Sequence, residues 1–301
     1  MLKIFIYSLL LLVFSACAPQ ETMIKHKVNT ECDVYSLKTA LCYDNQKLVQ
    51  KLENYQVVFI GDHHTQDDLH LKIANLIKAF SKNGKKVLLA NEWFYPSDNK
   101  LLKKFASGTI SEEEFQKEIK WKERLKRNKY DSFSPMYKAI RETKGELYGI
   151  NISKADRKKL SDQNLSSMSK EELNFNDNLD LNVYPHRELI LPFLSHCHAP
   201  KKGESLQACT ERMYHVQVAW DSKMALESYK LSKTLKKDEI LLVFAGSMHI
   251  ETRLGIPLRF ARLSNLASVT IIPADKETKF IDNDIGDYIL FYKQKDESIK
   301  K

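Results

Sequence analysis

The fold is decided by residues 56–92, QVVFIGDHHTQDDLHLKIANLIKAFSKNGKKVLLANE. The first six residues are mostly β-branched or aromatic and end in Gly, which predicts a buried strand. The apolar residues that come next recur at helical spacing: Leu69, Ile73, Leu76, Ile77 and Phe80. Asn83-Gly84 predicts the end of that helix, and KKVLLANE at 85–92 predicts a second strand. A strand, a helix and a strand within about 35 residues indicate a βαβ unit, and therefore a parallel sheet.

The rest of the chain extends this unit into a single α/β domain, residues 31–301. Short apolar runs predict four more strands, the last at the sheet edge: 146–151, 239–246, 268–273 and 287–293. Two stretches, about 97–135 and 155–235, have a helical rhythm, and SEEEFQKEIKW at 111–121 predicts a capped amphipathic helix. We expect a mainly parallel sheet flanked by helices, with a helical insertion subdomain over the carboxyl ends of the strands.

Polar residues follow three of the predicted strands. Asp62 and His64 follow the first strand, Glu92 ends the second, and His249 follows the run at 239–246. In an open parallel sheet ligands bind at the carboxyl ends of the strands, so these four side chains are expected to share one crevice. They suffice to hold a divalent metal with an open position, or they form a buried hydrogen-bond network without one. The other two histidines of this region are expected at the surface: His63 and His70.

A long helix is predicted from about Thr210 onward. Its apolar stripe consists of Met213, Val216, Trp220 and Met224. A neighbouring polar stripe has the spacing i, i+3 and i+7: Tyr214, Gln217 and Asp221. The polar stripe faces either solvent or the crevice.

The N-terminus predicts an exported lipoprotein. Lys3 and the apolar run IFIYSLLLLVF precede Ser15-Ala16-Cys17, and small residues before a cysteine mark a cleavage site. Residues 1–16 are therefore expected to be a lipoprotein signal peptide, Cys17 the lipidated residue and 17–30 a tether. The alternative is a plain secretory signal with a later cut. Lipid on Cys17 would anchor the chain to a bacterial membrane, which we take to be the outer membrane, with the chain facing the periplasm.

The other cysteines fit an oxidising compartment. They fall into two local pairs, Cys32 with Cys42 and Cys197 with Cys209. Four cysteines permit three connectivities, and we expect the local one, in which each disulfide stabilises the fold by roughly 3 kcal/mol. The tight C-x-x-C spacing of a structural metal site is absent from the sequence.

The formal net charge of +8 falls by one when Lys3 leaves with the signal peptide. This surplus indicates either a lysine-rich solvated surface or a basic pocket for an anionic ligand. Nucleic acid is excluded as a partner, because no basic helix or aromatic-basic motif occurs.

Four segments occur in one order: GDHH at 61–64, NEWF at 91–94, QVAWDSKMA at 217–225 and GSMHIETRLGIP at 246–257. Together they resemble the ChaN-like haem-binding lipoproteins of bacterial iron uptake, within the Tiki-type superfamily. The resemblance spans about residues 55–275. Superfamily members include metal-dependent proteases whose G-x-x-H motifs and Glu hold the metal, and 61–64, 246–249 and Glu92 match that form. Asp62 stands where many relatives carry Glu, which shortens the reach of the carboxylate.

The resemblance implies non-covalent haem binding, with a Tyr phenolate on the iron and a paired subunit completing the pocket. A hard anionic oxygen suits ferric iron, and the chain lacks the C-x-x-C-H of covalent attachment. Of the 13 tyrosines, three in or beside the helical insertions are the iron-ligand candidates: Tyr184, Tyr214 and Tyr95. The haem propionates pair with cationic or imidazole side chains, and the candidates for this role are His186, Arg187 and His215.

Two functions from different classes follow. The first is a haem-binding lipoprotein of iron uptake, not an enzyme, that forms a haem-linked homodimer and exchanges haem with an outer-membrane receptor. The alternative is a metal-dependent hydrolase that uses His64, Glu92 and His249. Haem affinity favours the first function, and a bound divalent metal without haem affinity favours the second.

Overall fold

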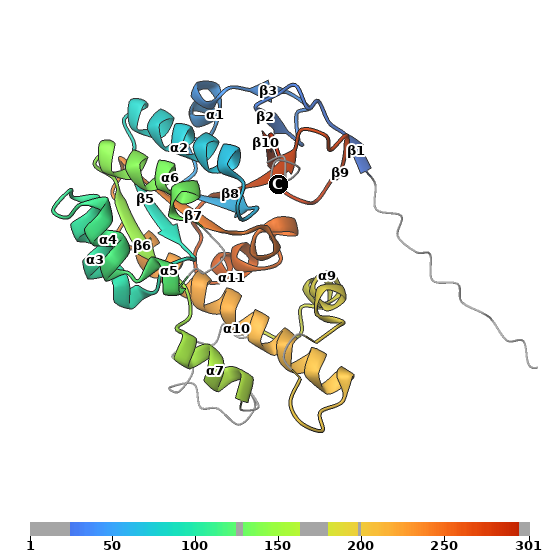
Figure 1. Cartoon of the computed structure of the whole chain (residues 1–301). Helices are drawn as coiled ribbons and strands as arrows, with labels where there is room; N and C mark the ends of the chain where they lie inside the picture. Colours follow the sequence, from blue (N-terminus) through green and yellow to red (C-terminus); the bar gives the residue numbers. More distant parts are fainter. Residues whose placement is uncertain (1–24, 125–128, 163–179, 198–199, 295–301) are drawn as a thin grey trace, which may run out of the picture.

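An eight-stranded sheet forms the centre of the molecule, in the order β3-β2-β10-β8-β4-β7-β5-β6 (Figure 1). The computed structural model describes residues 25–124, 129–162, 180–197 and 200–294, so the expected signal peptide and Cys17 lie outside the described residues. The strands have these bounds: β2 (Val34–Ser36), β3 (Cys42–Tyr43), β4 (Val57–Asp62), β5 (Lys86–Asn91), β6 (Glu146–Gly149), β7 (Glu239–Gly246), β8 (Ser268–Asp275) and β10 (Tyr288–Tyr292).

The parallel part of the sheet contains every strand that the apolar runs predicted. β4 pairs in parallel with β7 and β8, β5 pairs with β6 and β7, and β10 pairs with β8. The expectation that 287–293 lies at the edge is wrong, because β2 and β3 continue the sheet beyond β10 in antiparallel order. β2 has three residues and β3 two, which is too short to give a periodic signal in the sequence.

The stretch expected to be a tether, 17–30, is partly paired. Lys25–Lys27 form β1, which runs antiparallel to β9 (Phe280–Asp282). The pairing continues at the backbone of Val28, whose N–H donates to Lys279 O at 3.1 Å. The KHK sequence of β1 has no apolar alternation, so main-chain hydrogen bonds rather than side-chain burial hold this strand.

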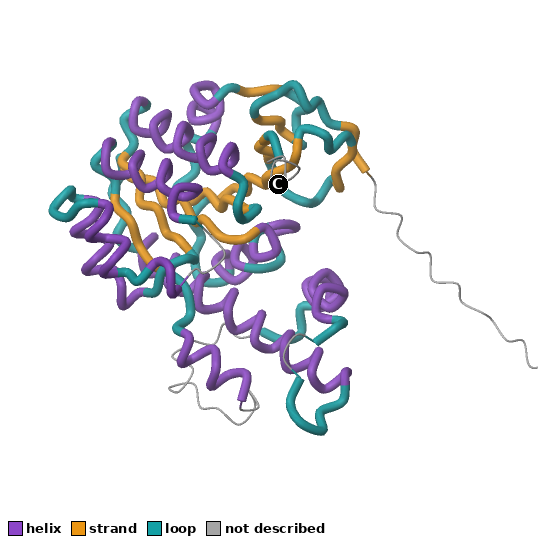
Figure 2. Tube along the Cα trace, viewed as in Figure 1, coloured by secondary structure: helices purple, strands orange, loops and turns teal. Residues whose placement is uncertain are grey.

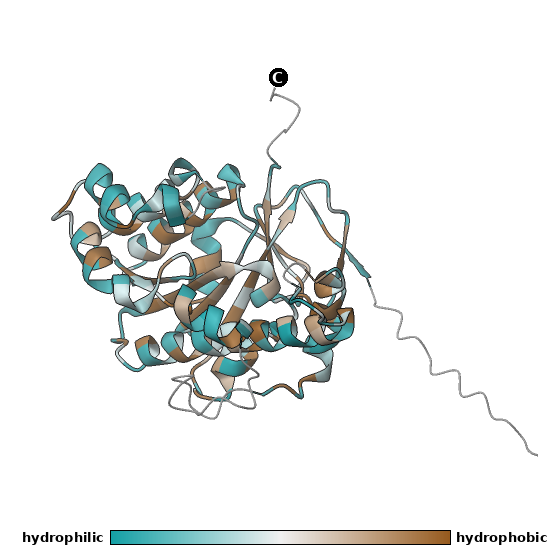
Figure 3. Ribbon diagram, turned by 60° about the horizontal axis from the view of Figure 1, so that its bottom comes forward, coloured by the Kyte–Doolittle hydropathy of each residue, from teal (hydrophilic) through white to brown (hydrophobic). Residues whose placement is uncertain are grey.

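Side chains that alternate along the strands build one apolar layer on each face of the sheet. On β4, Val58 and Ile60 belong to the buried cluster that contains α2 and α6, whereas Val57 and Phe59 belong to the cluster that contains α10 and α11. Figure 3 shows hydrophobic strands at the centre and hydrophilic residues on the outer surfaces of the helices. The helices of these layers are α1 (Asn45–Lys51), α2 (Asp67–Lys82), α6 (Tyr130–Glu142), α10 (Leu206–Ser232) and α11 (Ile256–Ala261).

The first insertion widens the helical layer on the α2 side. It contains α3 (Asn99–Ala106), α4 (Glu112–Glu118) and α5 (Trp121–Arg124). The buried rings of Phe105, Phe115 and Trp121 join the same cluster as α2 and α6. Ser111 and Glu114 form the predicted capping box at the start of α4.

The second insertion contributes α7 (Lys154–Asp162), α9 (Tyr184–Leu194) and α10. Met224 and Ala225 of α10 pack against the sheet, whereas the N-terminal half of this helix projects beyond the sheet and packs against α7 and α9 (Figure 2). This projecting group is the helical subdomain next to the carboxyl ends of the strands.

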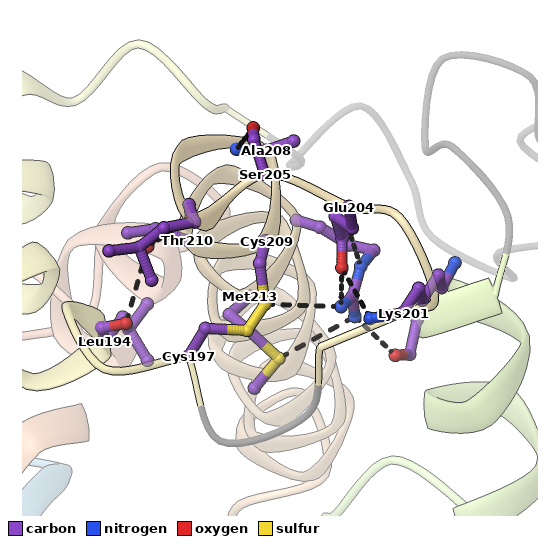
Figure 4. The surroundings of a disulfide bond; sticks show 12 residues. Leu194, Cys197, Lys201, Glu204, Ser205, Ala208, Cys209, Thr210 and Met213 are labelled. Carbon is purple, nitrogen blue, oxygen red and sulfur yellow. Dashed lines mark hydrogen bonds and ion pairs between the residues drawn. A yellow bond between two sulfur atoms is a disulfide. The ribbon is translucent and has the colours of Figure 1, made fainter.

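Both local cysteine pairs are joined, with Cα–Cα distances of 5.3 Å for Cys32–Cys42 and 5.9 Å for Cys197–Cys209. The second disulfide ties the end of α9 to the first turns of α10 (Figure 4). Beside it, Arg212 forms an ion pair with Glu204 at 2.7 Å, which also fixes the loop between the two helices. Within the described ranges, no helix is both long and apolar enough to cross a membrane.

Candidate functional site

Two glycines allow the ends of β4 and β7 to approach each other closely. A Cβ on Gly61 would lie 2.8 Å from Ser247 Oγ and 2.7 Å from Pro273 Cδ. A Cβ on Gly246 would lie 3.3 Å from His64 Cε1. Both glycines begin a G-x-x-H segment. A larger residue at Gly61 would clash with Ser247 and Pro273, and one at Gly246 would press on His64.

The structure brings Asp62, His64, Glu92 and His249 together at the carboxyl ends of β4, β5 and β7. Nε2 of His64 and Nε2 of His249 each lie 3.8 Å from a different oxygen of Glu92. Glu92 is 4% exposed, whereas the side chain of His64 is 45% exposed, so the crevice opens to solvent on the His64 side. The rings of Trp93 and Trp220 pack edge-on against His64 and His249 at 4.6 and 5.1 Å between ring centroids.

Each of these two histidines is oriented by a buried carboxylate on its other ring nitrogen. Nδ1 of His64 lies 2.7 Å from Asp62 Oδ2, and Nδ1 of His249 is hydrogen-bonded to Asp221 Oδ1. A carboxylate on Nδ1 fixes the ring and leaves Nε2 available to a ligand, as in carboxylate–histidine–metal arrangements. The polar stripe of α10 therefore faces the crevice.

Burial and charge shift the pKa values in this cluster. Burial raises the pKa of Glu92, and the charges of His249 and His64 offset this only in part. Burial alone would lower the pKa of His249, but the carboxylate of Asp221 outweighs burial and raises it. The pKa of His64 is raised in the same way, by its hydrogen bond to Asp62 and by Glu92. The crevice thus favours the cationic form of both imidazoles and the protonated form of Glu92.

His70 does not face solvent, so its expected surface position is wrong. It is fully buried on α2, its Nε2 lies 2.8 Å from Asp62 Oδ1, and its Nδ1 lies 2.9 Å from Ser132 Oγ. A loop and the first turn of α2 separate Asp62 from His70, so no local sequence pattern predicts this contact. His63 is partly buried, and its Nδ1 lies 2.8 Å from the hydroxyl of Tyr292.

Asp221 connects the crevice to α9. Its second oxygen, Oδ2, lies 3.2 Å from Nε2 of His186, and both side chains are fully buried. Nδ1 of His186 lies 3.4 Å from the hydroxyl of Tyr214, which is also fully buried. His186 and Tyr214 therefore hold α9 against α10. Neither side chain is presented to solvent.

The other haem-ligand candidates lie in different surroundings. Tyr184 is the first residue of α9 and is 73% exposed, whereas Tyr95 is partly buried under the guanidinium of Arg124 at 4.5 Å. Arg187 lies one turn after Tyr184, forms an ion pair with Glu211 and stacks over the Tyr214 ring at 5.2 Å. His215 is half-buried on α10, and burial lowers its pKa.

Residues 48–260 match a protein family described as haem-binding uptake, Tiki superfamily, ChaN. The chain belongs to this ChaN family. Its fold is that of ChaN from Campylobacter jejuni, a solved structure described as showing cofacial haem binding. The two chains are 18% identical. Their alignment covers 86% of this chain and 96% of the Campylobacter chain, with a TM-score of 0.66.

More distant structures resemble this ChaN-family chain less closely. They include the type III effector HopBA1, with 13% identity over 82% of this chain and 92% of that one, and a TM-score of 0.46. Erythromycin esterase EreC has 13% identity over 84% of this chain and 77% of that one, also with a TM-score of 0.46. No curated protein sequence matches the chain.

Proposed function

We propose that this chain binds haem non-covalently and that the phenolate of Tyr184 ligates the iron. The observation that carries this proposal is the position of Tyr184, 73% exposed at the start of α9 in a member of a haem-binding family. Tyr214 is fully buried against His186, and the ring of Tyr95 is covered by Arg124. An iron ligand must reach the centre of a wide, flat porphyrin, which an exposed side chain at a helix end does best. A haem titration followed by absorbance tests the proposal.

The surroundings of Tyr184 offer groups for one edge of a haem. A hollow of about 120 Å³, too small for a whole porphyrin, lies beside Tyr184 and is lined by Leu181, Asn182 and Arg187. Arg187 lies one turn along α9 from Tyr184 and lines the same hollow. Arg187 is also the cation best placed to pair with a propionate, and His215 offers a neutral hydrogen-bond partner on α10.

We further propose that a second copy of the chain covers the haem. Large apolar side chains of the helical subdomain are open to solvent: Phe193 of α9 is 53% and Leu206 of α10 is 60% exposed. A porphyrin face added to this surface would enlarge an apolar patch that monomers rarely expose. Cofacial haem binding is described for the Campylobacter protein, and two chains that pair through α9 would stack their haems in the same manner. Haem would then promote association by mass action.

For the cell, we propose a lipoprotein of iron uptake, anchored through Cys17 to the outer membrane and facing the periplasm. Its haem would come from, or pass to, an outer-membrane haem receptor. Support comes from the apolar run and small residues before Cys17, and from two disulfides, which persist in oxidising compartments.

Replacing Cys17 with Ala should remove the lipid and move the chain out of the membrane fraction, because two or more acyl chains provide the stable attachment. Cell fractionation and mass determination of the N-terminal peptide check this. The wild-type chain should partition with membranes, and the variant should be soluble or uncleaved. A cleaved Cys17→Ala chain that still sediments with membranes would contradict the lipid anchor.

A divalent metal site in the crevice is the second candidate, and it supports the hydrolase alternative. Asp62, His64 and Glu92 each bring a ligand atom within 4.8 Å of the others. We favour His249 over Asp62 as a ligand, because both oxygens of Asp62 already accept from histidines. His64 Nε2, Glu92 and His249 Nε2 would then hold the cation and leave positions open for water, which a metal ion activates for hydrolysis.

A metal site in the crevice predicts different zinc contents for variants of the adjacent residues His64 and His63. His64→Ala removes a proposed ligand and should lower the zinc content after dialysis at least about tenfold, since even outer partners of a ligand cost 10- to 100-fold in affinity. His63→Ala is the matched control, because His63 contacts Tyr292 instead of the crevice. Elemental analysis measures both. Equal zinc content in the two variants would reject the site.

A further inference from the structure

A second cavity lies at the β6 edge of the sheet, the edge opposite to β3. It has a volume of about 620 Å³ and is lined by residues of α3, of β6 and of the end of α6. Figure 1 shows that α3 lies beside β6, the strand at the sheet edge. The start of α3 is fixed against this edge, because Asn99 Oδ1 accepts the N–H of Gly149 at 2.8 Å. None of the crevice residues lines the cavity, so it is a separate feature from the site described above.

Four cations line this cavity: Lys100, Lys103, Arg141 and Lys144. The one carboxylate in the lining, Glu146, is already used by Lys86 and by the hydroxyl of Tyr148. Within the described ranges, the three lysines form no ion pair, whereas Lys78 and Lys138 on the neighbouring helices pair with Glu142 and Glu112. Like charges gathered around a concave surface concentrate a positive potential there, which attracts anions.

Arg141 is held in place before any ligand arrives. Its Nη2 donates to Gly108 O at 3.4 Å, and its guanidinium stacks over the Phe105 ring at 5.6 Å. Gly108 adopts a φ of +77°, and a Cβ there would lie 3.4 Å from the guanidinium. A fixed guanidinium recognises a carboxylate or phosphate with less loss of side-chain entropy than a free one.

The floor of the cavity is apolar. Ala106 and Leu147 are both buried, and the ring of Tyr148 continues this surface. Small-molecule sites of about 300–1,000 Å³ commonly combine such a floor with a few convergent polar groups. An inorganic anion would leave the floor uncovered, and a neutral hydrocarbon would leave Glu146 as the one carboxylate beside the four cations of the lining. We propose that this cavity binds an anionic amphiphile, a molecule with a carboxylate or phosphate head and an alkyl chain.

Calorimetric titration of the purified chain with dodecyl phosphate, below the concentration at which it forms micelles, tests this directly. The wild-type chain should bind it. Dodecyltrimethylammonium, which has the same chain and the opposite charge, should bind at least about tenfold more weakly, since like-charge contacts oppose association. Dodecanoate compares a carboxylate head with a phosphate head, and inorganic phosphate tests the head alone.

Two neighbouring lysines of α3 provide matched variants. Lys103→Glu reverses a charge in the lining and should weaken dodecyl phosphate binding at least about tenfold. Lys104→Glu makes the same change in net charge in the same helical turn, outside the lining, and should leave affinity within about twofold. Lys100→Glu is a second lining variant. The proposal is overturned by equal losses in the Lys103 and Lys104 variants, by equal binding of the cationic amphiphile, by inorganic phosphate binding as tightly, or by no binding at all.

Discussion

Replacing Tyr184 with Phe should abolish the phenolate-to-iron charge-transfer band of the haem complex. Phe keeps the aromatic ring and removes the oxygen, so the change separates coordination from packing. Loss of an outer partner alone typically costs a metal site 10- to 100-fold in affinity, and loss of the ligand itself should cost at least about a hundredfold. Because 73% of the Tyr184 surface is exposed, the substitution should change the stability of the fold little.

Tyr214→Phe and Tyr95→Phe are the controls for this experiment. The first removes only a hydroxyl that lies 3.4 Å from His186, and the second removes a hydroxyl at the start of a 3-10 turn. Both variants should keep the wild-type spectrum. Loss of the charge-transfer band in the Tyr214 variant, with the Tyr184 variant unchanged, would move the iron to the other tyrosine and refute our assignment.

Replacing Asp221 with Asn should lower the free energy of unfolding by about 3 kcal/mol, because removing one partner of a buried ion pair leaves the other charge uncompensated. Asp221 is fully buried and faces two histidines, His186 and His249. Glu227→Gln on the same helix is the control. Its partners are Lys223 and the largely exposed Lys230, so it should cost less than about 1 kcal/mol. Urea unfolding monitored by circular dichroism measures both.

The cost of Asp221→Asn should depend on pH. Burial alone would raise the pKa of Asp221, but His249 and His186 outweigh burial and hold this pKa well below its usual range. A lowered carboxyl pKa gives stability that is present above about pH 4 and lost as the pH falls. The raised pKa of His249 gives stability that is fully present below about pH 6.5. This stability is lost as the pH rises through the raised pKa of the folded state. The difference in the free energy of unfolding between the variant and the wild type should therefore be largest between about pH 4 and pH 6.5. A difference that keeps growing above pH 8 would contradict this pairing.

The sequence predicted the parallel centre of the fold because its strands are long apolar runs that end in polar residues. β4, β5 and β7 show this pattern, and the polar residue after each strand became a crevice residue. β2 and β3 have too few residues for any period, so their pairing with β10 depends on contacts distant in the sequence.

The second layer of the site was harder to predict. His70 lies three residues before Ile73, on the apolar face of α2, but this spacing does not show that Asp62 is its partner. The contact between His186 and Asp221 joins two helices across a loop that is closed by the Cys197–Cys209 disulfide, and no local spacing encodes it. The stripe of Tyr214, Gln217 and Asp221 was visible, but only packing decides which way such a stripe faces.

The most direct test of the central claim is an absorbance titration of the apo chain with ferric haem. We predict a shifted Soret band, high-spin ferric bands and saturation at about one haem per chain, as one phenolate ligand per chain requires. Size measurements on the same samples should show a larger assembly with haem than without it. Spectra that remain those of free haem at every ratio would contradict the account.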